Sequence, residues 1–444
     1  MTIFATMRPF YLFIWWCLSY SLRLFYRRIK LVNSPNSYFG RTIYMSNHPA
    51  SFMDPLVVAC FRKPIVFFMT RSDVFTPISK PLLWSAHMLP IYRQLDGVNT
   101  KEKNEEVFLE CSKILKSKRN LLVFAEGFTD DKFVRRLKPI KKGAVRIGFS
   151  ALEYLNWTEK IYIAGVGCNY TEPNRMRSDL LISTSDPICL NDYQKEYQSN
   201  PNKVISELTL LAEKMMQDQI THIHNSHLTD LHEWIMILTR KGMNSESYDK
   251  NLSLQSRYEY SKNLAIWMNQ TTIEELQPLK EVSKSYFDSL KMQKVTDNDI
   301  YNLINKKPNT PRKIAKLIFL MPLGILGLFH CGLPYIVVKI LVEKKFKRAV
   351  FWGSTKMLLT MILIGLFNIP VIFLFDHLLN VSKWWGFIYY LMIGFYGLGF
   401  YSSLSLIKEL IHISKIKKVD LGNLIEKRTH LVELLKKNVP SKFL

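Results

Sequence analysis

The sequence predicts an α/β domain in the N-terminal half and a helical membrane region in the C-terminal third. Short apolar runs alternate with amphipathic segments between Arg41 and about Asp192, which is typical of strands alternating with helices. Long runs without charge follow at residues 317–338, 357–375 and 386–407, each near the length of about 20 residues that a membrane-crossing helix needs. A chain of 444 residues is long enough for both modules.

Apolar runs predict the strands of the α/β domain at residues 42–46, 65–69, 121–124 and 162–166. Helices are expected to begin near Pro55, Thr100 and Lys142. In open α/β sheets, ligands bind in a crevice beyond the strand ends, and catalytic groups lie on the loops there. The polar motifs of this region directly follow predicted strands, so we expect a functional site at that edge.

The net charge of +23 predicts an anionic partner. An apolar share of 48% and the uncharged runs favour an anionic membrane over nucleic acid, and no nucleic-acid-binding motif is present. The six cysteines lack paired C-x-x-C spacing, so we expect reduced thiols rather than disulfides or a zinc site. No metal is predicted, because zinc-ligand spacing is also absent among the clustered histidines His222, His224, His227 and His232.

A histidine and a carboxylate stand close together after the first predicted strand, at His48 and Asp54. A histidine can accept a hydroxyl proton, and a carboxylate partner fixes its tautomer and stabilises the imidazolium. Pro49 disfavours a helical backbone at His48, and Asp54 before Pro55 is typical of a helix N-cap followed by proline. In the alternative interpretation, Asp54 only caps its helix and His48 is an ordinary loop histidine.

Three further motifs follow in order: LPIYR at residues 89–93, VFAEG at 123–127 and IAGVGCNY at 163–170. Together with Asn47-His48 and Asp54 they resemble the four sequence blocks of the glycerolipid acyltransferase family. The resemblance covers residues 45–170 and implies a compact acyltransferase domain with a central mixed sheet flanked by helices.

The resemblance implies that His48 and Asp54 are catalytic and that a further set of residues binds substrate, namely Arg93, Glu126, Gly127 and Lys141. A guanidinium at Arg93 matches phosphate oxygens, and a carboxylate at Glu126 can accept a hydrogen bond from a polyol hydroxyl. Taken alone, Arg93 would be an ordinary surface arginine and Glu126 a solvated turn residue. No cofactor is implied, since acyl-CoA or acyl-carrier protein serves as the acyl-donor substrate.

The sequence departs from the family pattern at several positions. Five residues rather than four separate His48 from Asp54, an H-x5-D spacing that resembles the fungal-type glycerol-3-phosphate acyltransferase branch. The extra residue must be absorbed by a bulge or turn. Ala125 replaces the proline of the third block, whose arginine is absent, and Gly165 replaces a proline of the fourth.

A basic segment precedes the helix predicted near Lys142 and contains Arg135, Arg136, Lys138, Lys141 and Lys142. Helix N-termini and nearby cations attract phosphate, so we expect this segment to compensate for the missing arginine. Only Lys141 matches a family element, Lys-x-Gly. The alternative is a solvated basic loop, or one that lies on anionic lipid.

Composition divides the chain into five predicted regions: an interfacial membrane anchor at 1–40, the catalytic domain at 41–192, a polar helical extension at 193–312, a membrane region at 313–412 and a basic cytoplasmic tail at 413–444. A re-entrant hairpin at 317–338 and two crossings would keep the basic loop around Lys344 inside. We therefore expect an integral membrane protein with a cytoplasmic catalytic domain.

The predicted reaction is acylation of glycerol 3-phosphate at the sn-1 hydroxyl, in phosphatidic acid biosynthesis, with anionic lipids as further partners. The alternative acceptor is lysophosphatidic acid. A non-catalytic lipid-binding adaptor is disfavoured by the intact His48 and Asp54, and a hydrolase by the absence of a Gly-x-Ser-x-Gly elbow. The sequence does not predict the oligomeric state.

Overall fold

The computed structural model describes residues 9–32, 40–61, 66–92, 100–305, 310–416 and 421–444. The chain divides into two compact units. The first comprises Met1–Arg23, Arg28–Pro173 and Ser178–His224, and the second comprises Leu24–Arg27, Asn174–Arg177 and Asn225–Leu444. Each unit is described by itself.

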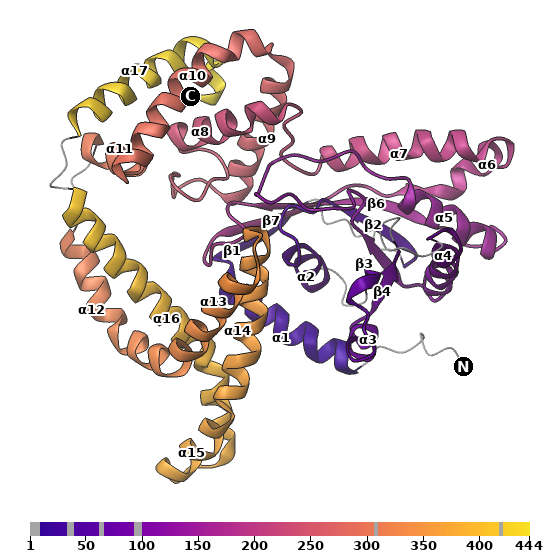
Figure 1. Ribbon diagram of the computed structural model, residues 1–444, viewed down its shortest axis with the longest axis horizontal. Helices are drawn as coiled ribbons and strands as arrows, with labels where there is room; N and C mark the ends of the chain where they lie inside the picture. The colour runs from indigo at the N-terminus through magenta and orange to yellow at the C-terminus, as the bar shows by residue number, and fades with distance from the viewer. Residues whose placement is uncertain (1–8, 33–39, 62–65, 93–99, 306–309, 417–420) are drawn as a thin grey trace. The chain divides into compact units, whose positions relative to one another are not determined.

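The first unit is an α/β domain built on one mixed sheet (Figure 1). Its strands lie in the order β1-β7-β6-β2-β5-β3-β4, and β8 pairs with β6. The strand bounds are β1 Arg28–Val32, β2 Thr42–Ser46, β3 Val66–Arg71, β4 Met88–Ile91, β5 Asn120–Val123, β6 Tyr162–Tyr170, β7 Asp179–Thr184 and β8 Ile188–Cys189. Pairing is parallel except between β6 and its neighbours β7 and β8. The predicted α/β class and mixed sheet are confirmed.

Helices of the first unit are α1 Pro9–Phe25, α2 Met53–Cys60, α3 Ser79–Ser85, α4 Thr100–Lys116, α5 Gly143–Tyr154, α6 Gln194–Ser199 and α7 Pro201–Gln217. The predicted helix starts near Pro55, Thr100 and Lys142 agree with α2, α4 and α5 to within two residues. The strand at 42–46 matches β2, whereas β6 extends beyond the predicted end at residue 166 because its last residues pair with β7. Residue 65 of the predicted strand at 65–69 lies outside the described residues.

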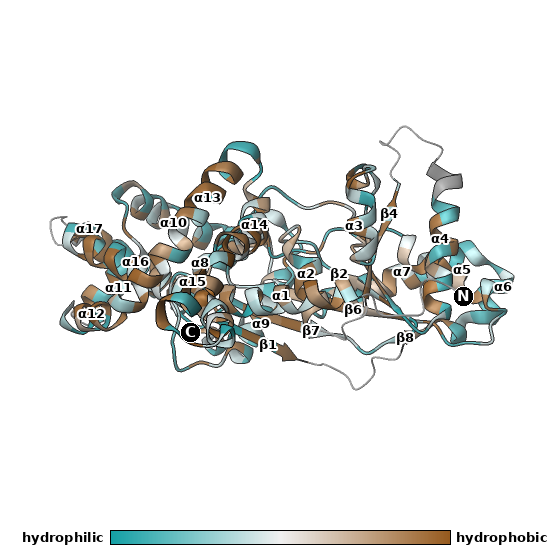
Figure 2. Cartoon of the chain, turned by 90° about the horizontal axis from the view of Figure 1, so that it is seen from below, coloured by the Kyte–Doolittle hydropathy of each residue, from teal (hydrophilic) through white to brown (hydrophobic). Residues whose placement is uncertain are grey.

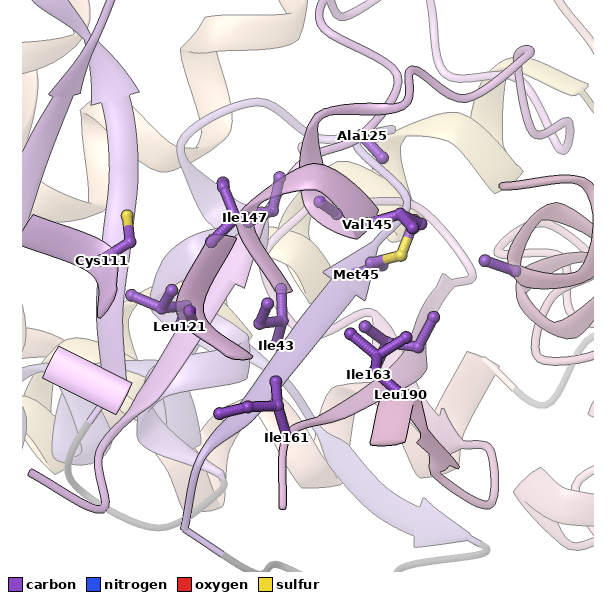
Figure 3. Packing of buried hydrophobic residues seen from close by; sticks show 14 of the residues in the cluster. Ile43, Met45, Cys111, Leu121, Ala125, Val145, Ile147, Ile161, Ile163 and Leu190 are labelled. Atoms are coloured by element: carbon purple, nitrogen blue, oxygen red, sulfur yellow. The ribbon is translucent and has the colours of Figure 1, made fainter. Parts of the chain in front are cut away.

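A continuous apolar core holds the sheet and places the ends of its central strands. Ile43 and Met45 of β2 are completely buried, and they pack among apolar side chains of β5, β6 and α5 (Figure 3). Burial of one such side chain contributes roughly 1.5–3 kcal/mol. Met45 pairs with Val123 of β5 and Ser46 pairs with Val166 of β6. The segments that follow β2 and β5 therefore leave the sheet at the same edge.

The sheet begins before the predicted domain boundary at residue 41. β1 at Arg28–Val32 pairs in parallel with β7, and the Arg28 guanidinium bonds the buried Asp179 carboxylate at 2.8 Å. The predicted anchor region at 1–40 thus contributes an edge strand as well as α1.

The second unit is helical in the part that the structure describes. Its polar helices are α8 Thr229–Thr239, α9 Leu254–Gln270, α10 Ile273–Gln293, α11 Asp297–Asn305 and α17 Gly422–Asn438. Its apolar helices are α12 Thr310–Gly327, the π-helical turn η5 Leu328–Gly332, α13 Leu333–Lys345, α14 Trp352–Phe367, α15 Ile369–Leu379 and α16 Lys383–Ile416. Figure 2 shows the apolar character of α13 and α16.

Three continuous helical stretches are long and apolar enough to cross a membrane: Thr310–Lys345, Ala349–Leu379 and Lys383–Ile416. This finding supports a membrane protein. In the first stretch α12 and α13 run in different directions on either side of η5 (Figure 1). Gly327 lies so close to α16 that an added Cβ would be 2.0 Å from the Tyr396 carbonyl oxygen, so this glycine allows close helix packing. The re-entrant hairpin stays a prediction.

A polar cluster joins the apolar helices at η5. His330 of η5 bonds Asn368 Oδ1 through Nδ1 at 2.7 Å and Tyr389 Oη through Nε2 at 2.9 Å. The Asn368 amide donates to the His330 carbonyl oxygen at 3.0 Å. Polar groups in an apolar environment are costly unless bonded, and both ring nitrogens here are bonded.

Candidate active site

His48 and Asp54 form a hydrogen-bonded pair beyond the end of β2. His48 Nδ1 lies 3.0 Å from Asp54 Oδ2, and the Asp54 side chain is completely buried. The Ala50 N–H donates to the same carboxylate oxygen at 2.9 Å. The structure thus brings together the two residues that the sequence singled out as a pair.

The N-cap prediction for Asp54 was wrong. α2 begins at Met53, so Asp54 lies in its first turn, and its carboxylate accepts from Ala50 upstream instead of capping the helix. The residues between His48 and Asp54 form a turn in which the Asp54 N–H bonds the Ser51 carbonyl, and Ser51 has a φ of +52°. This left-handed residue accommodates the longer spacing and leaves the carboxylate facing the imidazole.

Tyr170 at the end of β6 supplies a third group. Its hydroxyl donates to Asp54 Oδ1 at 2.8 Å, and the side chain is completely buried. An ionised carboxylate accepts bonds only, so the bond to His48 requires the imidazole proton on Nδ1. The lone pair of His48 is therefore on Nε2. Tyr170 and Asp54 together fix the tautomer that a general base needs.

The His48 ring is held in place yet accessible. It stacks on Phe124 with 4.2 Å between ring centroids, and the side chain is 20% exposed. Within the described ranges of the chain, Nε2 has no hydrogen-bond partner. This nitrogen is available to take a proton from a bound hydroxyl.

Glu126 fixes the backbone of the catalytic loop. Met45 and Val123 are register partners, and His48 and Glu126 each lie three residues further along. Glu126 Oε1 accepts the His48 N–H at 2.9 Å, and Oε2 lies 3.7 Å from Lys138 Nζ. Burial raises the pKa of the Glu126 carboxyl, an effect that the His48 N–H and Lys138 oppose. Glu126 was predicted to bind substrate, but one of its two carboxylate oxygens is already used by the His48 backbone.

Gly127 turns the chain beside Lys141. Its φ is +78°, and an added Cβ would lie 2.8 Å from Lys141 Nζ. The Lys141 N–H also donates to the Ala125 carbonyl oxygen at 2.9 Å. The positive φ favours glycine here, and the absence of a side chain leaves room for the end of the exposed Lys141 side chain against the turn that follows Glu126.

The remaining predicted cations have different positions. Arg135 is buried and donates to the Tyr170 carbonyl oxygen at 2.8 Å, whereas Lys142 bonds Ser206 on α7 at 2.7 Å. Arg136 is half-buried and lines a small cavity together with Arg135, Asn47, Pro49, Phe133, Val134, Cys168, Asn169, Ile220 and Thr221. Arg93 lies outside the described residues.

Sequence reasoning assigned no role to Asn47 and Tyr170, although both belong to the quoted motifs. The Asn47 side chain accepts the Cys168 N–H at 2.8 Å and donates to the Cys168 carbonyl oxygen at 3.1 Å. This pair of bonds ties the end of β2 to β6 directly before His48. The sequence did hold a signal for both residues, because Asn47 directly precedes the candidate base and Tyr170 is a polar residue at the end of a predicted motif.

The clustered histidines lie in different environments. His222 Nδ1 accepts the Leu137 N–H at 2.9 Å, and its Nε2 lies 2.9 Å from His224 Nδ1. Burial, His224 and Arg136 lower the pKa of His222 to about 4. No group of three or more His, Cys, Asp or Glu side chains placed to hold a metal ion occurs among the residues that the structure describes.

The fold and the dyad define a site that can activate a hydroxyl at the edge of an α/β sheet. Residues 28–169 match the family model described as Acyltransferase. This match runs from the start of β1 to the residue before the end of β6 and includes His48, Asp54 and Glu126. Tyr170 is the residue directly after it. The chain therefore carries an acyltransferase domain, which supports an enzyme of glycerolipid acyl transfer. A search of curated proteins finds no match to the chain.

Proposed function

We propose that the protein transfers a fatty acyl group from an acyl thioester to the sn-1 hydroxyl of glycerol 3-phosphate. The observation that carries the proposal is the 3.0 Å bond between His48 Nδ1 and the buried Asp54, which leaves Nε2 accessible. The H-x5-D spacing favours this acceptor over lysophosphatidic acid.

The reaction needs a single base at the hydroxyl. His48 Nε2 accepts the hydroxyl proton as the oxygen attacks the thioester carbonyl, and Asp54 stabilises the imidazolium. The tetrahedral intermediate then expels the thiolate, which takes the proton back from His48. Proton, electron pairs and leaving group balance without an acyl-enzyme.

Charge near the dyad supports a phosphorylated acceptor. Lys141 lies against the Gly127 turn, and Lys138 lies 3.7 Å from Glu126 and 3.2 Å from Asp130. Because Lys138 is bonded within the chain, Lys141 and Arg136 are better placed to bind a phosphate. Holding the phosphate orients the hydroxyl, and orientation can lower a barrier by up to roughly 7–11 kcal/mol.

The test uses the full chain in lipid vesicles with each acceptor in turn, and with both acyl-CoA and acyl-carrier protein. Mass spectrometry of the products separates the reactions. Lysophosphatidic acid formed from glycerol 3-phosphate supports the proposal. Phosphatidic acid formed only from added lysophosphatidic acid assigns the alternative acceptor, and no product with either acceptor overturns both.

A further inference from the structure

An exposed apolar protrusion lies between β3 and β4 in the first unit. The chain leaves β3 at Arg71, forms a short turn η1 at Ser72–Val74, and continues through α3 to Ser85. Ile78, directly before α3, is 93% exposed, and Leu82 and Trp84 on α3 are 54% and 37% exposed. Scattered apolar residues are normal on a surface, but a cluster at the tip of a protrusion indicates an interaction site.

The backbone of the protrusion is internally bonded. The Ser79 hydroxyl accepts the Thr76 N–H at 2.9 Å, and the Thr76 hydroxyl accepts the Ser79 N–H at 3.1 Å. At the other end the Ala86 N–H donates to the Leu82 carbonyl oxygen at 3.0 Å. A segment with these bonds can enter an apolar phase at low cost, because unbonded backbone groups are what that phase penalises.

α1 lies next to this protrusion (Figure 1). The ring of His87, just after α3, is stacked between Tyr11 of α1 and Phe67 of β3, with 4.2 Å between centroids on each side. α1 buries Tyr11, Leu18 and Leu22 against the unit. Its other face exposes apolar side chains, among them Phe13 at 62% and Trp16 at 50%.

Charge on the two helices selects the partner. Neither α1 nor α3 contains an acidic residue, and their cations are Arg23 and Lys80. Asp73 in η1 is neutralised by Arg71, whose Nε donates to Asp73 Oδ1 at 3.0 Å. Tryptophans with nearby cations are typical of the headgroup boundary of a bilayer.

We propose that α3 with its preceding turn is a second membrane contact of the α/β unit, and that residues 72–85 and the exposed face of α1 together dock on an anionic lipid bilayer. The same chain carries three helical stretches long enough to cross a membrane, so a bilayer is its ordinary surroundings. Two separate contacts, locked together through His87, would hold the domain in one orientation on the lipid surface.

The experiment places a polarity-sensitive fluorophore on single cysteines of the full chain in anionic vesicles that contain nitroxide-labelled lipids. Ile78→Cys tests the segment before α3 and Leu82→Cys tests α3 itself, in a background where the partly exposed Cys17 and Cys189 are replaced by alanine. Leu210→Cys on α7 is the matched control, since Leu210 is 68% exposed in the same unit. Both positions are exposed, so the substitutions should not disturb folding.

The expected result is quenching at residues 78 and 82 that exceeds the control by about threefold or more, as for a side chain buried at the headgroup boundary. Quenching equal to the control at both positions overturns the proposal. The same labelled variants in detergent, without nitroxide lipids, give a second measurement. A fluorophore that is not quenched in vesicles but changes its emission when acyl-CoA is added in detergent also overturns the proposal, because residues 72–85 would then bind the acyl chain of the donor. The readout does not depend on turnover, so it is separate from the test of the acyl-transfer reaction.

Discussion

His48 in the α/β unit and His330 in the apolar helices each use Nδ1 to bond a side-chain oxygen, at 3.0 Å and 2.7 Å respectively. Their Nε2 atoms differ. That of His330 is bonded to Tyr389, whereas that of His48 is accessible and has no partner in the described part of the chain. A second bond stabilises a helix contact, while an unused nitrogen at a surface retains the capacity to accept a proton. The comparison separates a structural histidine from a chemical one.

The largest expected effect comes from removing the accessible base. We expect His48→Ala to lower kcat about a thousandfold with little change in KM, since a positioned general base contributes roughly 10²–10⁴ in rate. The measurement is steady-state acyl transfer in vesicles. His224→Ala, an exposed histidine in the same unit, is the control and should keep full activity. Equal activity in His48→Ala and the control would remove His48 from the mechanism.

Tyr170→Phe tests the group behind the dyad. Loss of one bond to a charged acceptor costs roughly 1.5–3 kcal/mol, so we expect kcat to fall about ten- to a hundredfold while KM for both substrates is unchanged. Tyr44→Phe is the matched control, because it removes a hydroxyl from a different buried tyrosine, which lies on β2. If the role of Tyr170 is purely structural, Tyr170→Phe lowers the unfolding temperature, and its kcat falls no further than that of Tyr44→Phe.

His330→Leu addresses the other side of the comparison. His330→Leu removes the bonds to Asn368 and Tyr389. We expect the free energy of unfolding to fall by about 1 kcal/mol, the order of two interhelical hydrogen bonds in a membrane protein at roughly 0.6 kcal/mol each, with kcat unchanged. Thermal unfolding in detergent measures the change, with His377→Leu on the exposed face of α15 as control. A large loss of turnover in His330→Leu, with the fold intact, would contradict the assignment of this histidine as structural.

The effect confined to the narrowest conditions, acid pH, concerns His222, whose nitrogens are both bonded. Its pKa is lowered to about 4 in the folded chain, against an ordinary value near 6.5, so the unfolded chain binds more protons between these values. Folding stability from this group is present above pH 6.5 and is lost as the pH falls towards 4, by about 1 kcal/mol after allowance for solvent screening. His222→Asn, which keeps an acceptor for the Leu137 N–H, should flatten the unfolding temperature over this range. An unchanged slope would show that another group causes the acid sensitivity.

Much of the sheet could be predicted from the sequence because its strands are apolar runs with polar residues directly after them. β2 matched its prediction. His48 and Asp54 were paired correctly because they are only six residues apart, and Pro49 between them limits the backbone conformations of that short segment. Tyr170 and Asn47 received no role, since their partners lie 116 and 121 residues away and only the strand order brings them together. The same non-local pairing explains why Glu126 bonds the His48 backbone, a contact that no local pattern indicates.

The dyad network joins residues 48, 54, 126 and 170, which come from three neighbouring strands and the first turn of a helix. During synthesis His48 and Asp54 are made early and close together, but Glu126 follows His48 by 78 residues and Tyr170 follows Asp54 by 116. A nascent or truncated polypeptide that ends before β6 should therefore be chemically inert, even though it already contains the histidine. Turnover can begin only when the sheet is assembled across its centre, so acyl transfer would itself report on completion of this fold.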